Sequence, residues 1–141
     1  MQRHLFIRAT KYLLGLLGFT AMASSCIGRV EYGCPHVDYK ISGKVVNEEG
    51  DPVAGIEVST HDGYGQKDTT GVDGKFQISD SDISYPDRLS LKDVDGEENG
   101  LYKSKQAPLG RFTQVEKGDG HWYDGVYESE GLVITVEKEE N

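Results

Sequence analysis

The sequence lacks the short motifs that identify most hydrolases, nucleotide-binding enzymes and metal enzymes. It contains no G-x-S-x-G, no H-E-x-x-H, no C-x-x-C and no glycine-rich phosphate loop. Outside the N-terminal segment its histidines are His36, His61 and His121, which are widely separated. We expect them on the surface or at strand edges. No enzyme is therefore indicated, although an active site can assemble from residues far apart in a sequence.

No apolar run is long enough to span a bilayer. Residues 13–23 carry no charge, but they are about half of the ~20 residues that a spanning helix needs. Arg3, Arg8 and Lys11 precede them without any acidic residue, and small residues follow. A basic start, a short apolar stretch and small residues are typical of a secretory signal. We expect residues 1–25 to be a cleaved signal peptide.

The end of this segment, Ala23-Ser24-Ser25-Cys26, resembles a bacterial lipobox. The resemblance implies that Cys26 receives a diacylglyceryl group, becomes the first mature residue and is acylated on its amine, for example with palmitate. It departs from the pattern at Ala23, where leucine is usual. Each buried methylene adds about 0.8 kcal/mol, so several acyl chains hold a protein firmly to a membrane. The alternative is cleavage after Ala23 or Ser25, which would leave a soluble periplasmic protein in which Cys26 and Cys34 can pair.

Cysteine is otherwise scarce, because the chain has only Cys26 and Cys34. If lipid occupies Cys26, Cys34 has no partner within the chain, which is unusual for an exported protein. We expect Cys34 to be a small buried residue where a tether, residues 26–37, meets the fold. A modification site, an intermolecular disulfide and a weak metal site with His36 are the alternatives.

Basic residues are also few. Removing residues 1–25 takes away three basic residues and no acidic one, which leaves 12 basic against 24 acidic residues, a net charge of −12. Such a surface repels nucleic acid and anionic lipid head groups. Nucleic-acid binding is thereby excluded, and we expect the domain to stand off the membrane.

The remainder reads as strands, because apolar residues alternate with polar ones between glycine-rich turns. The strands are expected in residues 39–47, 55–61, 69–79, 87–94, 101–109, 111–116 and 131–139. The predicted core consists of Ile41, Val45, Ile56, Val58, Phe76, Ile78, Leu89, Leu91, Ile134 and Val136. About seven short strands without a helical period predict one all-β sandwich over residues 38–139.

Residues 41–78 resemble the carboxypeptidase regulatory-like domain, a transthyretin-like or immunoglobulin-like β-sandwich. The residues that carry this resemblance are Gly43-Lys44-Val45, Gly50-Asp51-Pro52-Val53, Gly55-Ile56-Glu57-Val58, Thr69-Thr70 and Asp73-Gly74-Lys75-Phe76. The resemblance implies the fold and says little about activity, because such domains are accessory modules without shared catalytic residues.

The mature chain is also similar to a narrower group, the putative lipoproteins encoded beside a radical SAM enzyme in Bacteroides-like bacteria. The similarity is carried by Tyr32-Gly33, Pro35, Tyr39 and Gly43, and by the acidic loop "DVDGEENG" at residues 93–100. It implies that the protein is a partner or substrate of that enzyme.

Two clusters suggest ligands. Asp93, Asp95, Glu97 and Asn99 place oxygen atoms at alternate positions, which partly imitates a calcium loop. The more ordinary interpretation is an acidic turn. Trp122, Tyr123 and Tyr127 could stack on sugar rings, although aromatic residues in strands more often pack on the core or on a neighbouring strand.

Two functions remain open. The first is a non-catalytic lipoprotein of the bacterial cell envelope, anchored at the outer membrane, that serves as an interaction or assembly module. The second is a surface lipoprotein that binds glycan or calcium. An exposed aromatic platform at Trp122 and Tyr123 would favour the second function.

Overall fold

The structure, a computed structural model, describes residues 33–140. The predicted signal peptide and Cys26 lie outside the described residues. The described part forms eight strands and one short 3-10 turn: β1 (His36–Val46), β2 (Ile56–Ser59), η1 (His61–Gly63), β3 (Lys67–Thr69), β4 (Lys75–Asp82), β5 (Arg88–Asp93), β6 (Lys105–Pro108), β7 (Thr113–Lys117) and β8 (Tyr123–Thr135). None of the described residues forms a helix long and apolar enough to cross a bilayer.

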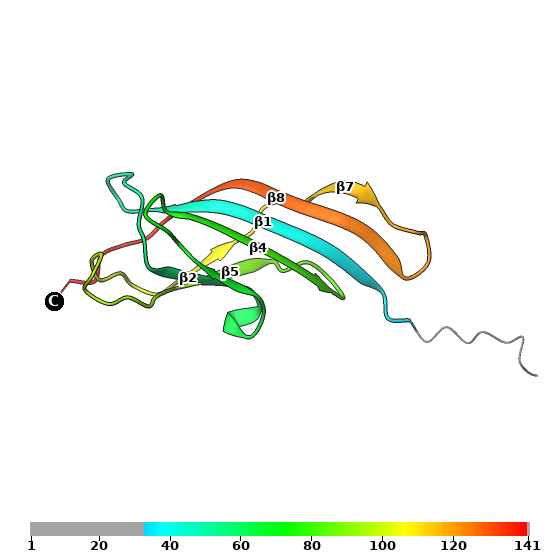
Figure 1. The fold of residues 1–141 in the computed structure, drawn as a ribbon, viewed down its shortest axis with the longest axis horizontal. Coiled ribbons are helices and arrows are strands. Elements are labelled where there is room, and N and C mark those ends of the chain that lie inside the picture. The colour runs from blue at the N-terminus through cyan, green and yellow to red at the C-terminus, as the bar shows by residue number, and fades with distance from the viewer. Residues whose placement is uncertain (1–32, 141) are drawn as a thin grey trace, which may run out of the picture. The chain divides into compact units, whose positions relative to one another are not determined.

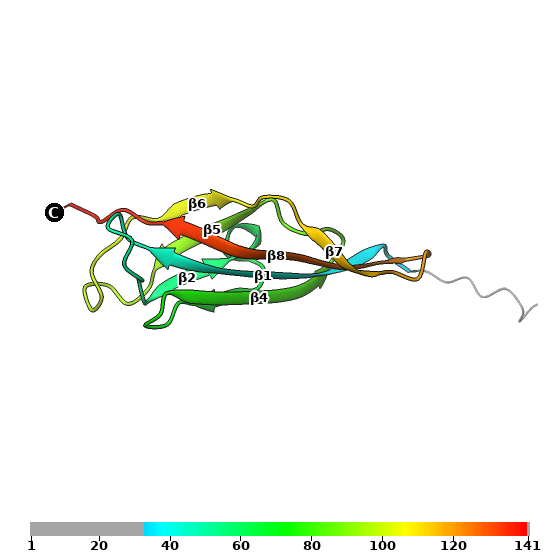
Figure 2. The ribbon, with the colours of Figure 1, turned by 90° about the horizontal axis from the view of Figure 1, so that it is seen from above.

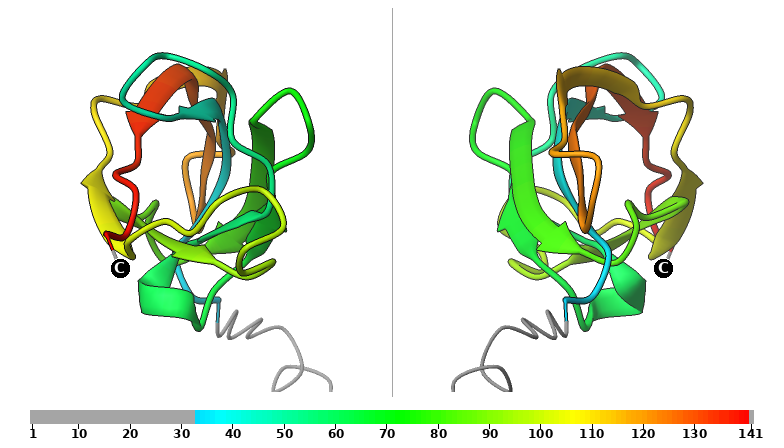
Figure 3. Two further views of the ribbon diagram at one scale, coloured as in Figure 1. Left: turned by 90° about the vertical axis from the view of Figure 1, so that its left-hand side faces the viewer. Right: turned by 90° about the vertical axis from the view of Figure 1, so that its right-hand side faces the viewer.

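The strands form two four-stranded sheets with the orders β4-β1-β8-β7 and β3-β2-β5-β6. β1 and β8 run parallel, and the other paired strands run antiparallel. Figures 1 and 2 show the two sheets from the side and from above, and Figure 3 shows them from the ends of their strands. The predicted all-β sandwich is confirmed.

The core lies between the sheets and follows the alternation of the sequence. All ten residues predicted to be buried are buried. Gly43 belongs to the inward-facing set of β1, and a methyl group there would lie 2.7 Å from the carbonyl oxygen of Leu132 and 2.9 Å from the ring of Phe76. Phe76 thus fills the space that a side chain at position 43 would need.

Several boundaries differ from the prediction. The strand predicted over residues 69–79 is two strands, β3 and β4, which belong to different sheets. β1 begins at His36, inside the predicted tether. The aromatic stretch and the last predicted strand form one strand, β8, which pairs with β1 along its length. Gly131, predicted as the first residue of the last strand, lies inside β8, and its φ of +69° accommodates an irregularity at which β8 advances from Ser129 to Leu132 while β1 advances from Ile41 to Gly43. A β-bulge of this kind keeps a long strand paired.

Candidate functional surfaces

The start of β1 meets the turn between β7 and β8 at one end of the sandwich, which we call the tether end (Figure 1). The His36 N–H donates to the Trp122 carbonyl oxygen at 2.8 Å. The rings of His36 and Tyr123 have centroids 5.1 Å apart. The Tyr123 hydroxyl donates to Asp38 at 3.0 Å. These contacts fix the β7–β8 turn against the first residues of the fold.

The β7–β8 turn is held in shape by Asp119. One oxygen of its carboxylate accepts the N–H groups of His121, at 2.8 Å, and Tyr123, at 3.2 Å. These hydrogen bonds, the one from His121 first, lower the pKa of Asp119, because they favour the charged carboxylate. Beside the turn lies an open groove of about 490 Å³. Its lining includes Pro35, Ile83, Lys117, His121 and Trp122.

Cys34 is exposed, and the expectation that it would be buried is wrong. Residues 34–36 are all exposed, and Val37 is the first buried residue of the chain's described part. Cys34 lies before β1, so neither sheet packs over it. Its carbonyl oxygen is 3.3 Å from Nδ1 of His36, which orders the backbone but leaves the thiol open to solvent. The predicted modification site is therefore accessible.

The three aromatic residues of the predicted sugar site have different surroundings. Trp122 is 41% exposed and lines the groove. Tyr123 packs beside His36, and burial followed by its hydrogen bond to Asp38 raises the pKa of Tyr123. Tyr127 lies against Tyr85, with ring centroids 5.2 Å apart. The Tyr127 hydroxyl donates to Asp124 at 2.9 Å. Of the three rings, only that of Trp122 belongs to an exposed residue.

The acidic loop does not assemble the predicted calcium site. Asp93 accepts the N–H of Gly96 with one oxygen, at 3.0 Å, and the N–H of Tyr102 with the other, at 2.9 Å. Asp95 accepts a hydrogen bond from Asn99, while Glu97 is exposed. Within residues 33–140, no three His, Cys, Asp or Glu side chains are grouped so that they could hold a metal ion. The carboxylates of Asp93 and Asp95 accept hydrogen bonds in this loop, which agrees with the more ordinary interpretation of an acidic turn.

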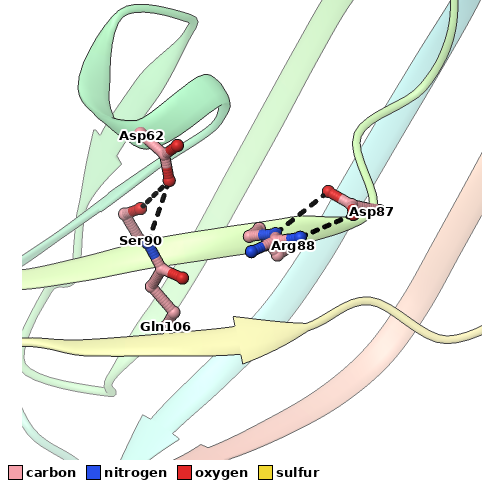
Figure 4. A network of polar contacts seen from close by, with 5 residues as sticks. All are labelled: Asp62, Asp87, Arg88, Ser90 and Gln106. Carbon is pink, nitrogen blue, oxygen red and sulfur yellow. Dashed lines mark hydrogen bonds and ion pairs between the residues drawn. The ribbon is translucent and has the colours of Figure 1, made fainter.

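A second polar cluster lies on the outer face of the β3-β2-β5-β6 sheet (Figure 4). Asp62 accepts hydrogen bonds from Ser90 at 3.4 Å and from Gln106 at 3.0 Å. Beside them, the Arg88 side chain holds Asp87 through two contacts of 3.2 and 3.0 Å and lowers the pKa of Asp87. The cluster fastens the loop after β2 to β5 and β6.

This loop carries backbone strain that the hydrogen bonds of Asp62 offset. His61 and Asp62 both have positive φ angles, of 50° and 54°, which non-glycine residues rarely adopt. His61 also contacts Asp82 at 3.2 Å. Sequence reasoning did not identify this cluster, because Asp62 is 28 residues from Ser90 and 44 from Gln106. His36, His61 and His121 are all exposed, as predicted.

No protein-family model matches the chain, and no curated protein matches its sequence.

Proposed function

We propose that this chain is a non-catalytic lipoprotein of the bacterial cell envelope, anchored at the outer membrane through acylated Cys26. Its β-sandwich serves as an interaction or assembly module. The observation that carries the proposal is the boundary of the fold. The compact unit begins at Cys34, eight residues after Cys26. Cleavage and acylation at Cys26 would therefore leave every strand intact.

The test of anchoring compares Cys26→Ala with Cys34→Ala. Cells are labelled with a radioactive fatty acid, and the protein is followed into membrane and soluble fractions. Cys26→Ala should lose the label and leave the membrane fraction, because it removes the thiol that accepts the lipid. Cys34→Ala should keep the label and remain in the membrane fraction. Label that persists in Cys26→Ala would contradict the proposal, as would an unlabelled parent protein.

The narrower part of the proposal is that a radical SAM enzyme encoded nearby uses this protein as a partner or substrate. Two features support it. The segment that carries the resemblance contains Cys34, and the Cys34 thiol is exposed at the junction with the fold. An enzyme can reach an exposed thiol next to an irregular segment without unfolding the domain.

Intact mass and peptide mapping of the mature protein test this part. The Cys34 peptide should carry a mass increment in cells that hold the enzyme and lose it when the enzyme gene is deleted. If the peptide has the unmodified mass in both strains, the protein is not a substrate at Cys34. Co-purification of the enzyme with Cys34→Ala then decides whether it is a partner.

A further inference from the structure

The geometry of the tether end points to a membrane contact. We propose that this end of the sandwich rests on the lipid surface to which Cys26 is anchored, with Trp122 among neutral or zwitterionic lipid head groups. The inference rests on the anchoring proposed above. It replaces the expectation, drawn from net charge, that the domain stands off the membrane.

The first argument is the short connection between the lipid and the fold. Cys34 is eight residues after Cys26. A chain of this length reaches at most about 29 Å even when it is fully extended. The chain enters the fold at the tether end, where the His36 N–H donates to the Trp122 carbonyl oxygen. The anchor therefore holds Trp122 close to the head groups.

The second argument is the chemistry of the groove. Trp122 is 41% exposed, and Ile83, which lines the same groove, is 70% exposed. Pro35, which is also exposed, lines the same groove. Tryptophan is enriched at membrane interfaces, because its ring is apolar and its N–H reaches polar groups. An apolar surface this small would bind lipid weakly alone, but an anchor in the same molecule raises its effective concentration.

The third argument is the distribution of charge. At the tether end, Asp38, Asp119 and Asp124 each accept hydrogen bonds from nearby groups, and Lys117 lines the groove. The opposite end, which we call the far end, holds the loop at residues 93–100 and the C-terminal residues 137–140 (Figure 1). These two segments contribute seven carboxylates. Neutral or zwitterionic head groups carry no net charge, so they do not repel the carboxylates of the tether end, and the most acidic segments lie at the other end of the sandwich.

Trp122 is the only tryptophan of the chain, so its fluorescence reports this contact directly. The lipidated mature protein is reconstituted in phosphatidylcholine vesicles, with or without brominated acyl chains. We expect emission about twofold weaker in the brominated vesicles, because an interfacial ring lies near the acyl chains. A matched control combines Trp122→Phe with Val72→Trp. Val72 is 91% exposed and lies near the last residues of β1. The emission of the control should therefore be the same in vesicles with and without brominated acyl chains.

The outcomes separate the two proposals. If the protein does not float with vesicles, the anchoring of Cys26 fails. If it floats but bromine quenches Trp122 no more than the control, the membrane contact is overturned while the anchor stands. Soluble cell-wall glycan fragments could instead shift the emission of Trp122 while bromine does not quench it. This result would also overturn the membrane contact and would show that the groove binds glycan. The comparison of the two vesicle types needs no variant, so poor folding of the control cannot obscure it.

Discussion

Phe76 packs against the β4-β1-β8-β7 sheet with its ring in the space beside Gly43. Phe76→Ala would leave a cavity that the backbone of two strands cannot close. We expect a loss of about 3–5 kcal/mol in the free energy of unfolding, measured by urea denaturation. Val133→Ala, at a residue that is 69% exposed, should change it little. Equal stabilities of the two variants would contradict this account of the core.

Tyr39 is 1% exposed, and burial raises the pKa of its hydroxyl. In the unfolded chain a tyrosine ionises near pH 10, before the folded protein can release the same proton. The contribution of Tyr39 to stability is therefore constant below about pH 10 and is lost as pH rises through the folded pKa. Melting curves between neutral and alkaline pH should fall more steeply for the parent than for Tyr39→Phe. Parallel curves would show that this hydroxyl is not shielded.

Cys34 should react quickly with a thiol reagent in the native protein, because the residue is exposed. Labelling in buffer should approach the rate seen in denaturant. The experiment is done on protein from a strain without the candidate radical SAM enzyme, so that modification cannot block the thiol. A native rate far below the denatured rate would restore the expectation of burial.

At the scale of the strands, the free edge of β4 is protected by carboxylates. The N–H groups of Lys75, Gln77, Ser81 and Ile83 donate to the side chains of Asp73, Asp68, Asp80 and Asp82. These alternate N–H groups point away from β1. An exposed sheet edge with free N–H groups invites pairing with another molecule. The aspartates fill these positions and add negative charge.

Replacing these aspartates should therefore promote self-association. Asp68→Ala combined with Asp73→Ala frees the Lys75 and Gln77 N–H groups, and we expect sedimentation velocity to show dimers or larger species that the parent does not form. Asp51→Ala combined with Asp87→Ala removes the same charge from exposed positions outside this edge and should remain like the parent. If both double variants self-associate equally, net charge rather than protection of the β4 edge prevents self-association of the parent.

The strands and their buried residues could be predicted, because they depend on the local sequence. Alternation placed Ile41, Val45 and the rest of the core correctly, since each depends only on its own strand. Contacts between distant segments could not be predicted. The bond from His36 to Trp122 and the cluster around Asp62 depend on strand order, as does the continuity of β8 through Gly131. The sequence of the acidic loop suggested a calcium site, because it does not reveal that both carboxylate oxygens of Asp93 accept hydrogen bonds from backbone N–H groups.

For the whole molecule, the distribution of charge is as informative as its sum. The far end combines the acidic loop with the C-terminal run, so like charges repel one another across a small surface. Repulsion between exposed charges is screened by salt, with a Debye length near 30 Å at 0.01 M and 3 Å at 1 M. The folded state concentrates these charges more than the unfolded chain does, and so it gains more from screening.

We therefore expect the melting temperature of the mature domain to rise by a few degrees between low and high sodium chloride at pH 7. This rise corresponds to roughly 1 kcal/mol in the free energy of unfolding. A variant with Glu97→Gln, Glu98→Gln, Glu139→Gln and Glu140→Gln should melt higher at low salt and depend less on salt, because these exposed residues lie at the far end. Asp87→Asn is the opposite control, since Asp87 is paired with Arg88 and its loss removes an attraction. A melting temperature that falls with salt, or the same salt dependence in the far-end variant and the parent, would show that repulsion at the far end does not limit stability.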